Sequence, residues 1–128
     1  MTMPLRVLII EDFEPDAALV IYELRRGNRA LDVQVVATIA DTRAALTSPG
    51  APWDVVLCDW SLPGFLALDV LPIVNELAVD TPVIIVSGAI SEELAVSVMR
   101  AGARDFVLKD RLARLAPAVE REVREAEA

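Results

Sequence analysis

Five short apolar segments recur along the chain at regular spacing, and amphipathic stretches separate them. The segments are rich in Val, Ile and Leu, and they are near-continuous hydrophobic runs rather than alternating ones. Such runs are typical of strands that are buried on both faces of a parallel sheet. The predicted strands are Leu5–Ile10, Val33–Ala37, Val55–Cys58, Val83–Val86 and Phe106–Leu108.

Each predicted strand is followed by a stretch with helical spacing of apolar side chains and with recognisable end signals. Pro15 suits the first turn of a helix, where the N–H that proline lacks has no partner. Thr38 and Ser91 are typical capping residues for two later helices. Pro72 predicts that the third helix starts late, with this proline in its first turn. The predicted helices are Pro15–Arg26, Thr38 to near Ser48–Gly50, Asp69–Ala78, Ser91–Ala101, and Pro117 to near the C-terminus.

The alternation of strand and helix predicts an α/β fold with right-handed crossovers and helices on both faces of the sheet. The length of 128 residues fits one domain, residues 1–128. In open sheets of this class, functional side chains lie beyond the carboxyl ends of the strands. We therefore expect the chemistry of this protein at the strand ends.

Composition narrows the function classes. Hydrophobic residues make up 55% and charged residues 25%, which supports a folded core rather than disorder. The net charge of −8 argues against direct binding to nucleic acid or to anionic membranes. The sequence has no histidine, which excludes histidine-based catalysis and phosphohistidine, and its single cysteine excludes an internal disulfide. No apolar run approaches the roughly 20 residues of a membrane span, and the start lacks a secretory signal, so we expect a cytoplasmic protein.

Charged side chains stand directly after three predicted strands. Glu11 and Asp12 follow the first strand, Asp59 the third, and Lys109 the fifth, while Ser87 stands at the end of the fourth. Three carboxylates that converge repel one another unless a cation lies between them, and Mg²⁺ is a hard cation that prefers oxygen ligands. The combination of carboxylate nucleophile, metal, cation and hydroxyl is typical of a phosphoryl-handling site.

Each of these residues also has an ordinary structural interpretation. An acidic pair such as Glu11 and Asp12 suits a solvated loop, Asp59 suits a turn, and a lysine such as Lys109 suits the surface. The joint placement at strand ends favours the functional interpretation.

Four ordered motifs carry a family resemblance across nearly the whole chain. They are VLIIED at 7–12, DVVLCDWSLPGF at 54–65, PVIIVSG at 82–88 and MRAGARDFVLKD at 99–110. In this combination the sequence resembles the receiver domain of two-component response regulators. The resemblance implies a three-layer, flavodoxin-like, doubly wound sandwich, in which five helices flank a five-stranded parallel sheet of order 2-1-3-4-5.

The resemblance also implies a role for each strand-end residue. Asp59 matches the phosphoacceptor. Glu11, Asp12, Asp59 and the backbone carbonyl of Ser61 match the ligands of Mg²⁺. Lys109 matches the lysine that pairs with the phosphoryl group. A carboxylate that receives a phosphoryl group becomes an acyl phosphate, and the cations neutralise the charge on its oxygens.

Two further residues match the family's switch. Ser87 matches the hydroxyl that moves to bond the phosphoryl group, and Phe106 matches the aromatic side chain that rotates inward.

The implied partners are a histidine kinase or histidine phosphotransfer protein as phosphoryl donor, and an output domain or protein on the face of helix 4, strand 5 and helix 5. The sequence also leaves open the alternative that two copies of the chain form a homodimer through the last helix. Such a domain catalyses only its own phosphorylation and dephosphorylation and turns over no diffusible substrate.

The sequence departs from the family pattern beside the site. Asp110 follows Lys109 where the family has proline with a cis peptide bond, so we predict a trans bond and an altered loop. Ala67 stands where glycine is usual and Gly64 comes earlier, which predicts a reshaped loop. Pro72 predicts a shortened or kinked third helix.

Two alternative functions remain open from the sequence. One is a degenerate receiver that acts as a phosphorylation-independent protein-interaction module. The other is a Mg²⁺-dependent phosphohydrolase on a similar sheet. That enzyme would need a second acid–base carboxylate two residues after the nucleophile, where this chain has Ser61.

Overall fold

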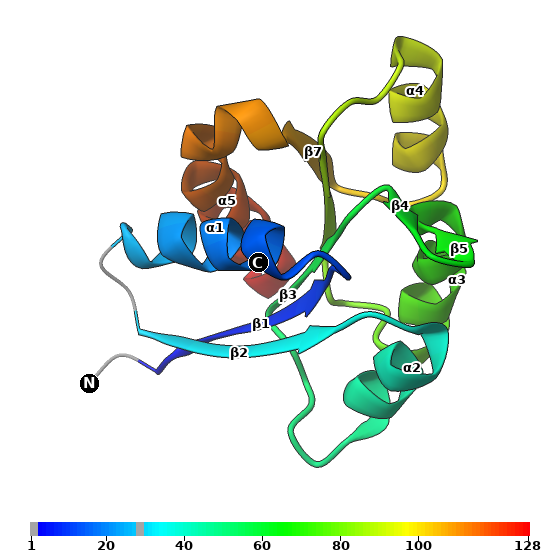
Figure 1. Ribbon diagram of the computed structural model, residues 1–128. Coiled ribbons are helices and arrows are strands. Elements are labelled where there is room, and N and C mark those ends of the chain that lie inside the picture. The colour runs from blue at the N-terminus through cyan, green and yellow to red at the C-terminus, as the bar shows by residue number, and fades with distance from the viewer. Residues whose placement is uncertain (1–2, 28–29) are drawn as a thin grey trace.

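Five parallel strands form one sheet in the computed structural model, which describes residues 3–27 and 30–128 (Figure 1). The spatial order of these strands is β2-β1-β3-β6-β7. Counted along the chain as five strands, this is the predicted order 2-1-3-4-5, and the flavodoxin-like fold is confirmed. The strands are β1 (Leu5–Ile10), β2 (Leu31–Val36), β3 (Val55–Cys58), β6 (Val83–Ser87) and β7 (Asp105–Leu108).

Helices cover both faces of the sheet and complete a three-layer sandwich (Figure 1). One face carries α1 (Glu14–Arg25) and α5 (Leu115–Glu127). The other face carries α2 (Ile39–Thr47), α3 (Ala67–Leu77) and α4 (Glu92–Arg100). Within the described residues, none of these helices has the length and apolar character needed to cross a bilayer.

Strand β3 shows why the central segments are continuously apolar. Its four residues are fully buried, but they face opposite layers. Val55 and Leu57 pack with the core under α1 and α5, whereas Val56 and Cys58 pack with the core under α2, α3 and α4. Because successive side chains of a strand point to opposite faces, a strand between two helical layers needs apolar residues at every position.

Two predicted helix caps are confirmed. Thr38 Oγ1 accepts a hydrogen bond of 3.0 Å from the Asp41 backbone N–H, and Ser91 Oγ accepts one of 3.1 Å from Leu94. Both bonds satisfy backbone donors that a helix start leaves without a partner. After α4, Gly102 adopts a φ of 116°, a conformation that glycine reaches without steric cost.

The predicted late start of the third helix is wrong. Helix α3 begins at Ala67, so Pro72 is its sixth residue and lies beyond the first turn. The start is fixed upstream, where the Asp69 carboxylate accepts a 2.8 Å hydrogen bond from the Leu66 backbone N–H. Burial of neighbours such as Leu71 offsets the hydrogen bond that proline removes. The helix therefore runs through the proline for eleven residues rather than being shortened.

The segment after β3 folds into a small antiparallel hairpin that the strand pattern did not predict. Its strands are β4 (Ser61–Leu62) and β5 (Phe65–Leu66). Gly64 lies in the turn with a φ of 87°. That the loop is reshaped relative to the family stays a prediction.

The segment after β7 also differs from the family pattern. Among the described residues the cis peptide bond lies at Ala51–Pro52, so the bond between Lys109 and Asp110 is trans, as predicted. A 3-10 helix, η1 (Lys109–Arg114), follows, and α5 starts directly after it. The predicted start of the last helix at Pro117 is therefore two residues late.

Candidate functional site

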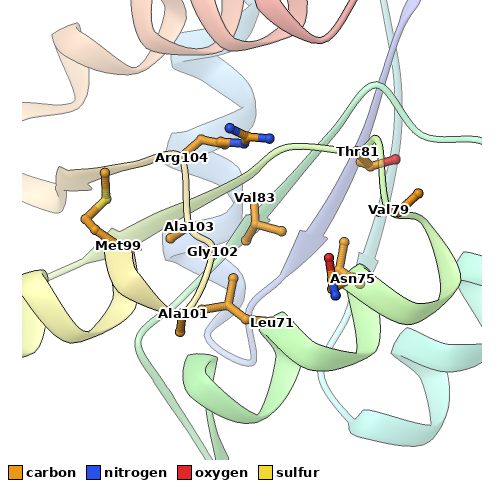
Figure 2. A pocket seen from close by; sticks show the side chains of 11 residues that line it. Leu71, Asn75, Val79, Thr81, Val83, Met99, Ala101, Gly102, Ala103 and Arg104 are labelled. Atoms are coloured by element: carbon orange, nitrogen blue, oxygen red, sulfur yellow. The ribbon is translucent and has the colours of Figure 1, made fainter.

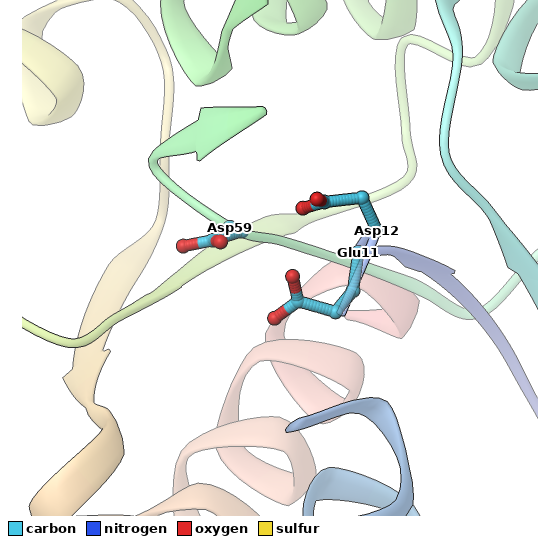
Figure 3. Close-up of side chains that lie close together, drawn as sticks. All are labelled: Glu11, Asp12 and Asp59. Carbon is cyan, nitrogen blue, oxygen red and sulfur yellow. The ribbon is translucent and has the colours of Figure 1, made fainter. Parts of the chain in front are cut away.

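Acidic side chains from two adjacent strands meet at one edge of the sheet (Figure 3). Ile10 of β1 is in register with Cys58 of β3, so the residues that follow them emerge side by side. The Asp59 backbone N–H donates a 3.0 Å hydrogen bond to the Ile10 carbonyl, which continues this alignment. Carboxylate oxygens of Glu11, Asp12 and Asp59 lie within 4.8 Å of one another.

Lys109 brings a positive charge to the same edge from the end of β7. Its ammonium nitrogen lies 2.7 Å from Glu11 Oε1, 2.7 Å from Asp16 Oδ2 and 3.3 Å from Asp59 Oδ2. Two of the three N–H donors of the ammonium make hydrogen bonds, to Glu11 and Asp16, and the contact with Asp59 is an ion pair. Lys109 is the only lysine in the sequence, and the other basic side chains are arginines.

The site holds more negative than positive charge. Burial raises the pKa of Glu11, and the nearby Asp59 charge adds to this rise, although the hydrogen bond from Lys109 opposes it. For Lys109, burial opposes the charged form, but the hydrogen bonds to Asp16 and Glu11 outweigh burial and hold its pKa above the usual value. One ammonium thus faces more carboxylates than it can neutralise.

The three strand-end acids fit a hard divalent cation. Their converging atoms are carboxylate oxygens, which are the ligands that Mg²⁺ prefers. Glu11 is 5% exposed, whereas Asp12 is exposed to solvent. An edge that is closed on one side and open on the other suits Mg²⁺, because this ion keeps several of its water ligands. Glu11, Asp12 and Asp59 could therefore hold such an ion.

The structure brings Ser87 to the same edge but not into contact with the carboxylates. Ser87 is the last residue of β6 and is 4% exposed. Its hydroxyl donates a 3.1 Å hydrogen bond to the carbonyl of Ala89 in the following loop.

Ser61 lies in β4, two residues beyond Asp59, and is exposed. Between them, the Trp60 backbone N–H donates to Asp59 Oδ1 at 2.8 Å.

Phe106 stands on β7, next to β6 in the sheet, and is half-buried. Its side chain borders an open hollow of about 670 Å³ beside α4. Val96 and Met99 of α4 border the same hollow and are 45% and 41% exposed. The predicted switch residue therefore lies beside a partly apolar surface of α4.

A second hollow, of about 290 Å³, is separate from the acidic edge (Figure 2). It lies between the ends of α3 and α4, where Leu71, Met99 and Arg104 line it. Val83, the first residue of β6, also lines it, whereas Ser87 ends that strand at the opposite edge of the sheet. None of the predicted site residues lines this second hollow.

Sequence reasoning missed Asp16, which is a direct partner of Lys109. Asp16 lies in the first turn of α1, four residues after Asp12. The signal available in the sequence was an acidic residue at the start of the helix that follows β1, since that helix start lies at the same edge as the strand end.

Comparison with known proteins identifies relatives over most of the chain. The family model described as "Response regulator receiver domain" matches residues 7–120. The response regulator protein PilR of Pseudomonas aeruginosa is 30% identical over 104 residues, which cover 81% of this chain and 22% of that protein. The phosphate regulon transcriptional regulatory protein PhoB of Klebsiella pneumoniae is 29% identical over 111 residues, covering 84% of this chain and 46% of PhoB. The chain thus spans less than half the length of these relatives.

Solved structures support the same relationship. The signal receiver domain of a putative LuxO repressor protein from Vibrio parahaemolyticus superposes with a TM-score of 0.84 at 28% identity, covering 98% of this chain and 94% of that one. A CheY-like receiver domain protein from Methanospirillum hungatei has a TM-score of 0.83 at 22% identity, with 98% of both chains covered, and this likeness concerns the fold.

Proposed function

Because this chain belongs to the response regulator receiver domain family, we propose that Asp59 accepts a phosphoryl group and so carries the signal of a two-component phosphorelay. The observation that supports this most strongly is the contact of 3.3 Å between Lys109 Nζ and Asp59 Oδ2, beside the converging oxygens of Glu11 and Asp12. Receiver domains are signalling domains rather than enzymes that turn over a diffusible substrate. We assign the receiver unit to residues 1–128.

In the proposed reaction, an Asp59 carboxylate oxygen attacks the phosphorus of the donor. The bond from phosphorus to the donor's imidazole nitrogen breaks, and a new phosphorus–oxygen bond makes an acyl phosphate. Lys109 then pairs with the phosphoryl oxygens and neutralises part of their charge. Glu11, Asp12, Asp59 and the Ser61 carbonyl would hold Mg²⁺, which when bound supplies further charge neutralisation at these oxygens.

The proposed output is a change at the surface of α4, β7 and α5. The phosphoryl oxygens offer the Ser87 hydroxyl a new acceptor, so Ser87 exchanges its present bond to Ala89 for one to the phosphoryl group. Its displacement leaves room for Phe106 to turn inward from the hollow beside α4. A local change in charge thereby shifts a two-state element.

The proposed partners follow from the same assignment. Residues 1–128 contain no histidine, so the phosphoryl donor is a histidine kinase or histidine phosphotransfer group outside these residues, and this unit is the acceptor. An output domain or protein would bind the surface of α4, β7 and α5. We place this exchange in the cytoplasm, with no direct contact to nucleic acid or membrane by this unit.

Neither alternative function is favoured. A degenerate receiver needs none of the site's charges, yet Glu11, Asp12, Asp59 and Lys109 are all present and adjacent. A phosphohydrolase would need an acid–base carboxylate where the chain has Ser61.

The test is intact-mass spectrometry after incubation with acetyl phosphate, with and without Mg²⁺. We expect one phosphoryl adduct on the wild-type chain that requires Mg²⁺ and is absent from Asp59→Asn. The matched control is Asp80→Asn, which makes the same change at an exposed acid outside the site and should keep the adduct. Circular dichroism checks that both variants are folded. A wild-type chain that gains no adduct with Mg²⁺ present would instead support the interaction module.

A further inference from the structure

Asp16 differs from the other two carboxylates that Lys109 contacts. Glu11 and Asp59 follow strands and belong to the group that could hold a metal ion, whereas Asp16 lies on α1 and is outside that group. Its contact with the ammonium, at 2.7 Å, is nonetheless shorter than that of Asp59, at 3.3 Å. In the unphosphorylated site, the Lys109 ammonium therefore lies closer to Asp16 and Glu11 than to Asp59.

Asp16 is also the partner that Lys109 can leave at the lowest cost. The side chain of Asp16 is 28% exposed, compared with 15% for Asp59 and 4% for Glu11. Water can therefore solvate the freed Asp16 carboxylate, whereas a freed Glu11 would stay buried without its cation. The first turn of α1 further favours a negative charge at Asp16 through the helix dipole.

A phosphoryl group on Asp59 changes the balance between these partners. It replaces the single negative charge of the carboxylate with about two negative charges on the phosphoryl group near pH 7, and it places several acceptor oxygens beside the ammonium. Two of the three donors of Lys109 already bond to Glu11 and Asp16, so the ammonium can turn more than one donor to the phosphoryl group only by giving up one of these bonds.

We propose that Asp16 is a positioning residue that holds Lys109 while Asp59 is unphosphorylated and releases it to the phosphoryl group. The inference rests on the proposed function of Asp59 as phosphoacceptor. Asp16 competes with the phosphoryl group for a single ammonium, so it lowers the affinity of the site for that group. The exchange also breaks the ion pair between Asp16, at the start of α1, and Lys109, at the start of η1.

The test measures the affinity of the Mg²⁺-loaded chain for beryllofluoride, a phosphoryl mimic, by calorimetry. Asp16→Asn removes the competing charge and should bind beryllofluoride about two- to fivefold more tightly than wild type, the upper part of the range expected for loss of a partly exposed ion pair. Glu14→Gln is the matched control. It removes one charge from the same turn of α1 at an exposed residue that does not contact Lys109, and should change the affinity less than twofold.

A second arm asks whether Asp16 acts through Lys109. In a Lys109→Ala background the gain from Asp16→Asn should disappear, a coupling that a general effect on folding would not produce. Because the chain has one lysine, ¹⁵N-lysine labelling adds a single ammonium signal that reports the exchange directly. That signal should shift on Asp16→Asn without any ligand.

The outcomes distinguish failure of the proposed function of Asp59 from failure of the proposed role of Asp16. If wild type binds no beryllofluoride, the proposed function and this inference both fail. If wild type binds it but Asp16→Asn binds equally or more weakly, or if the gain persists without Lys109, the inference alone is overturned.

Discussion

The ammonium nitrogen of Lys109 lies 3.3 Å from Oδ2 of Asp59, although the strands that precede them, β7 and β3, do not pair with each other. Strand β6 lies between them, and the length of the lysine side chain spans that gap. The same ammonium also contacts Glu11 at 2.7 Å, so it links Asp59 to the acidic pair after β1. The Lys109 ammonium is therefore expected to contribute both to the stability of the fold and to the proposed function.

Loss of that cation should destabilise the metal-free fold. Lys109→Met leaves the nearly buried Glu11 carboxylate and its neighbour Asp59 without their shared partner, and we expect a loss of about 2–4 kcal/mol in the free energy of unfolding. Urea unfolding without Mg²⁺ measures this. Arg111→Met, at an exposed position in η1, removes one positive charge outside the site and should cost less than 1 kcal/mol.

Mg²⁺ should compensate for the missing lysine. Because a bound cation neutralises the same carboxylates, the stabilisation by Mg²⁺ should be larger for Lys109→Met than for wild type. Equal stabilisation of both proteins would show that the metal and the lysine do not share these partners.

Neutralising Asp59 should have the opposite effect on stability. Asp59→Asn removes one of three converging carboxylates, keeps an oxygen to accept from Trp60, and leaves Lys109 with Glu11 and Asp16. We expect the free energy of unfolding without Mg²⁺ to rise by about 0.5–2 kcal/mol, since like charges at this distance repel. A clear loss of stability in urea would mean that the ion pair to Asp59 outweighs that repulsion.

The two tryptophans should respond differently to Mg²⁺. Trp60 is half-buried and its backbone N–H donates to Asp59 Oδ1, whereas Trp53 is 5% exposed and its ring stacks on Arg6 before β3 begins. A Trp53→Phe chain should keep the fluorescence change that Mg²⁺ produces, and a Trp60→Phe chain should lose it. A response that follows Trp53 instead would place the metal away from Asp59.

Pro72 should reduce the stability of α3. It is exposed at the sixth position of the helix, where it removes a backbone hydrogen bond and crowds the preceding turn. Pro72→Ala should therefore raise the free energy of unfolding by about 1–3 kcal/mol. Asn75→Ala, exposed on the same helix, controls for helix propensity and should gain about 0.5 kcal/mol. Equal gains would show that the helix accommodates the proline without strain.

The sheet could be predicted from the sequence because burial on both faces leaves an unmistakable pattern. The bounds of β1 and β3 agree with the prediction to the residue, since every position in them except Arg6 is apolar and buried. The hairpin of β4 and β5 was missed because strands of two residues are too short to show any periodicity. The start of α3 was misplaced because a contact from Asp69 outweighed the preference of Pro72 for a first turn.

The site was predictable to the extent that it follows from topology. Parallel strands end at one edge, so Glu11, Asp12, Asp59 and Lys109 had to converge once the sheet was assigned. The contact of Asp16 with Lys109 depends instead on how α1 docks against η1. The acidic residue at the start of that helix indicates the edge of the sheet at which Asp16 lies, but packing between segments distant in sequence decides which side chain it contacts.

The most direct test of the account identifies the carboxylate that carries the phosphate. The chain is treated with acetyl phosphate and Mg²⁺, and borohydride then reduces the acyl phosphate, which marks the modified side chain for peptide mass spectrometry. We predict that the mark falls on Asp59 alone and requires Mg²⁺. A mark on Glu11, Asp12 or Asp16, or an unmarked Asp59 in a chain that is otherwise folded, would contradict the account.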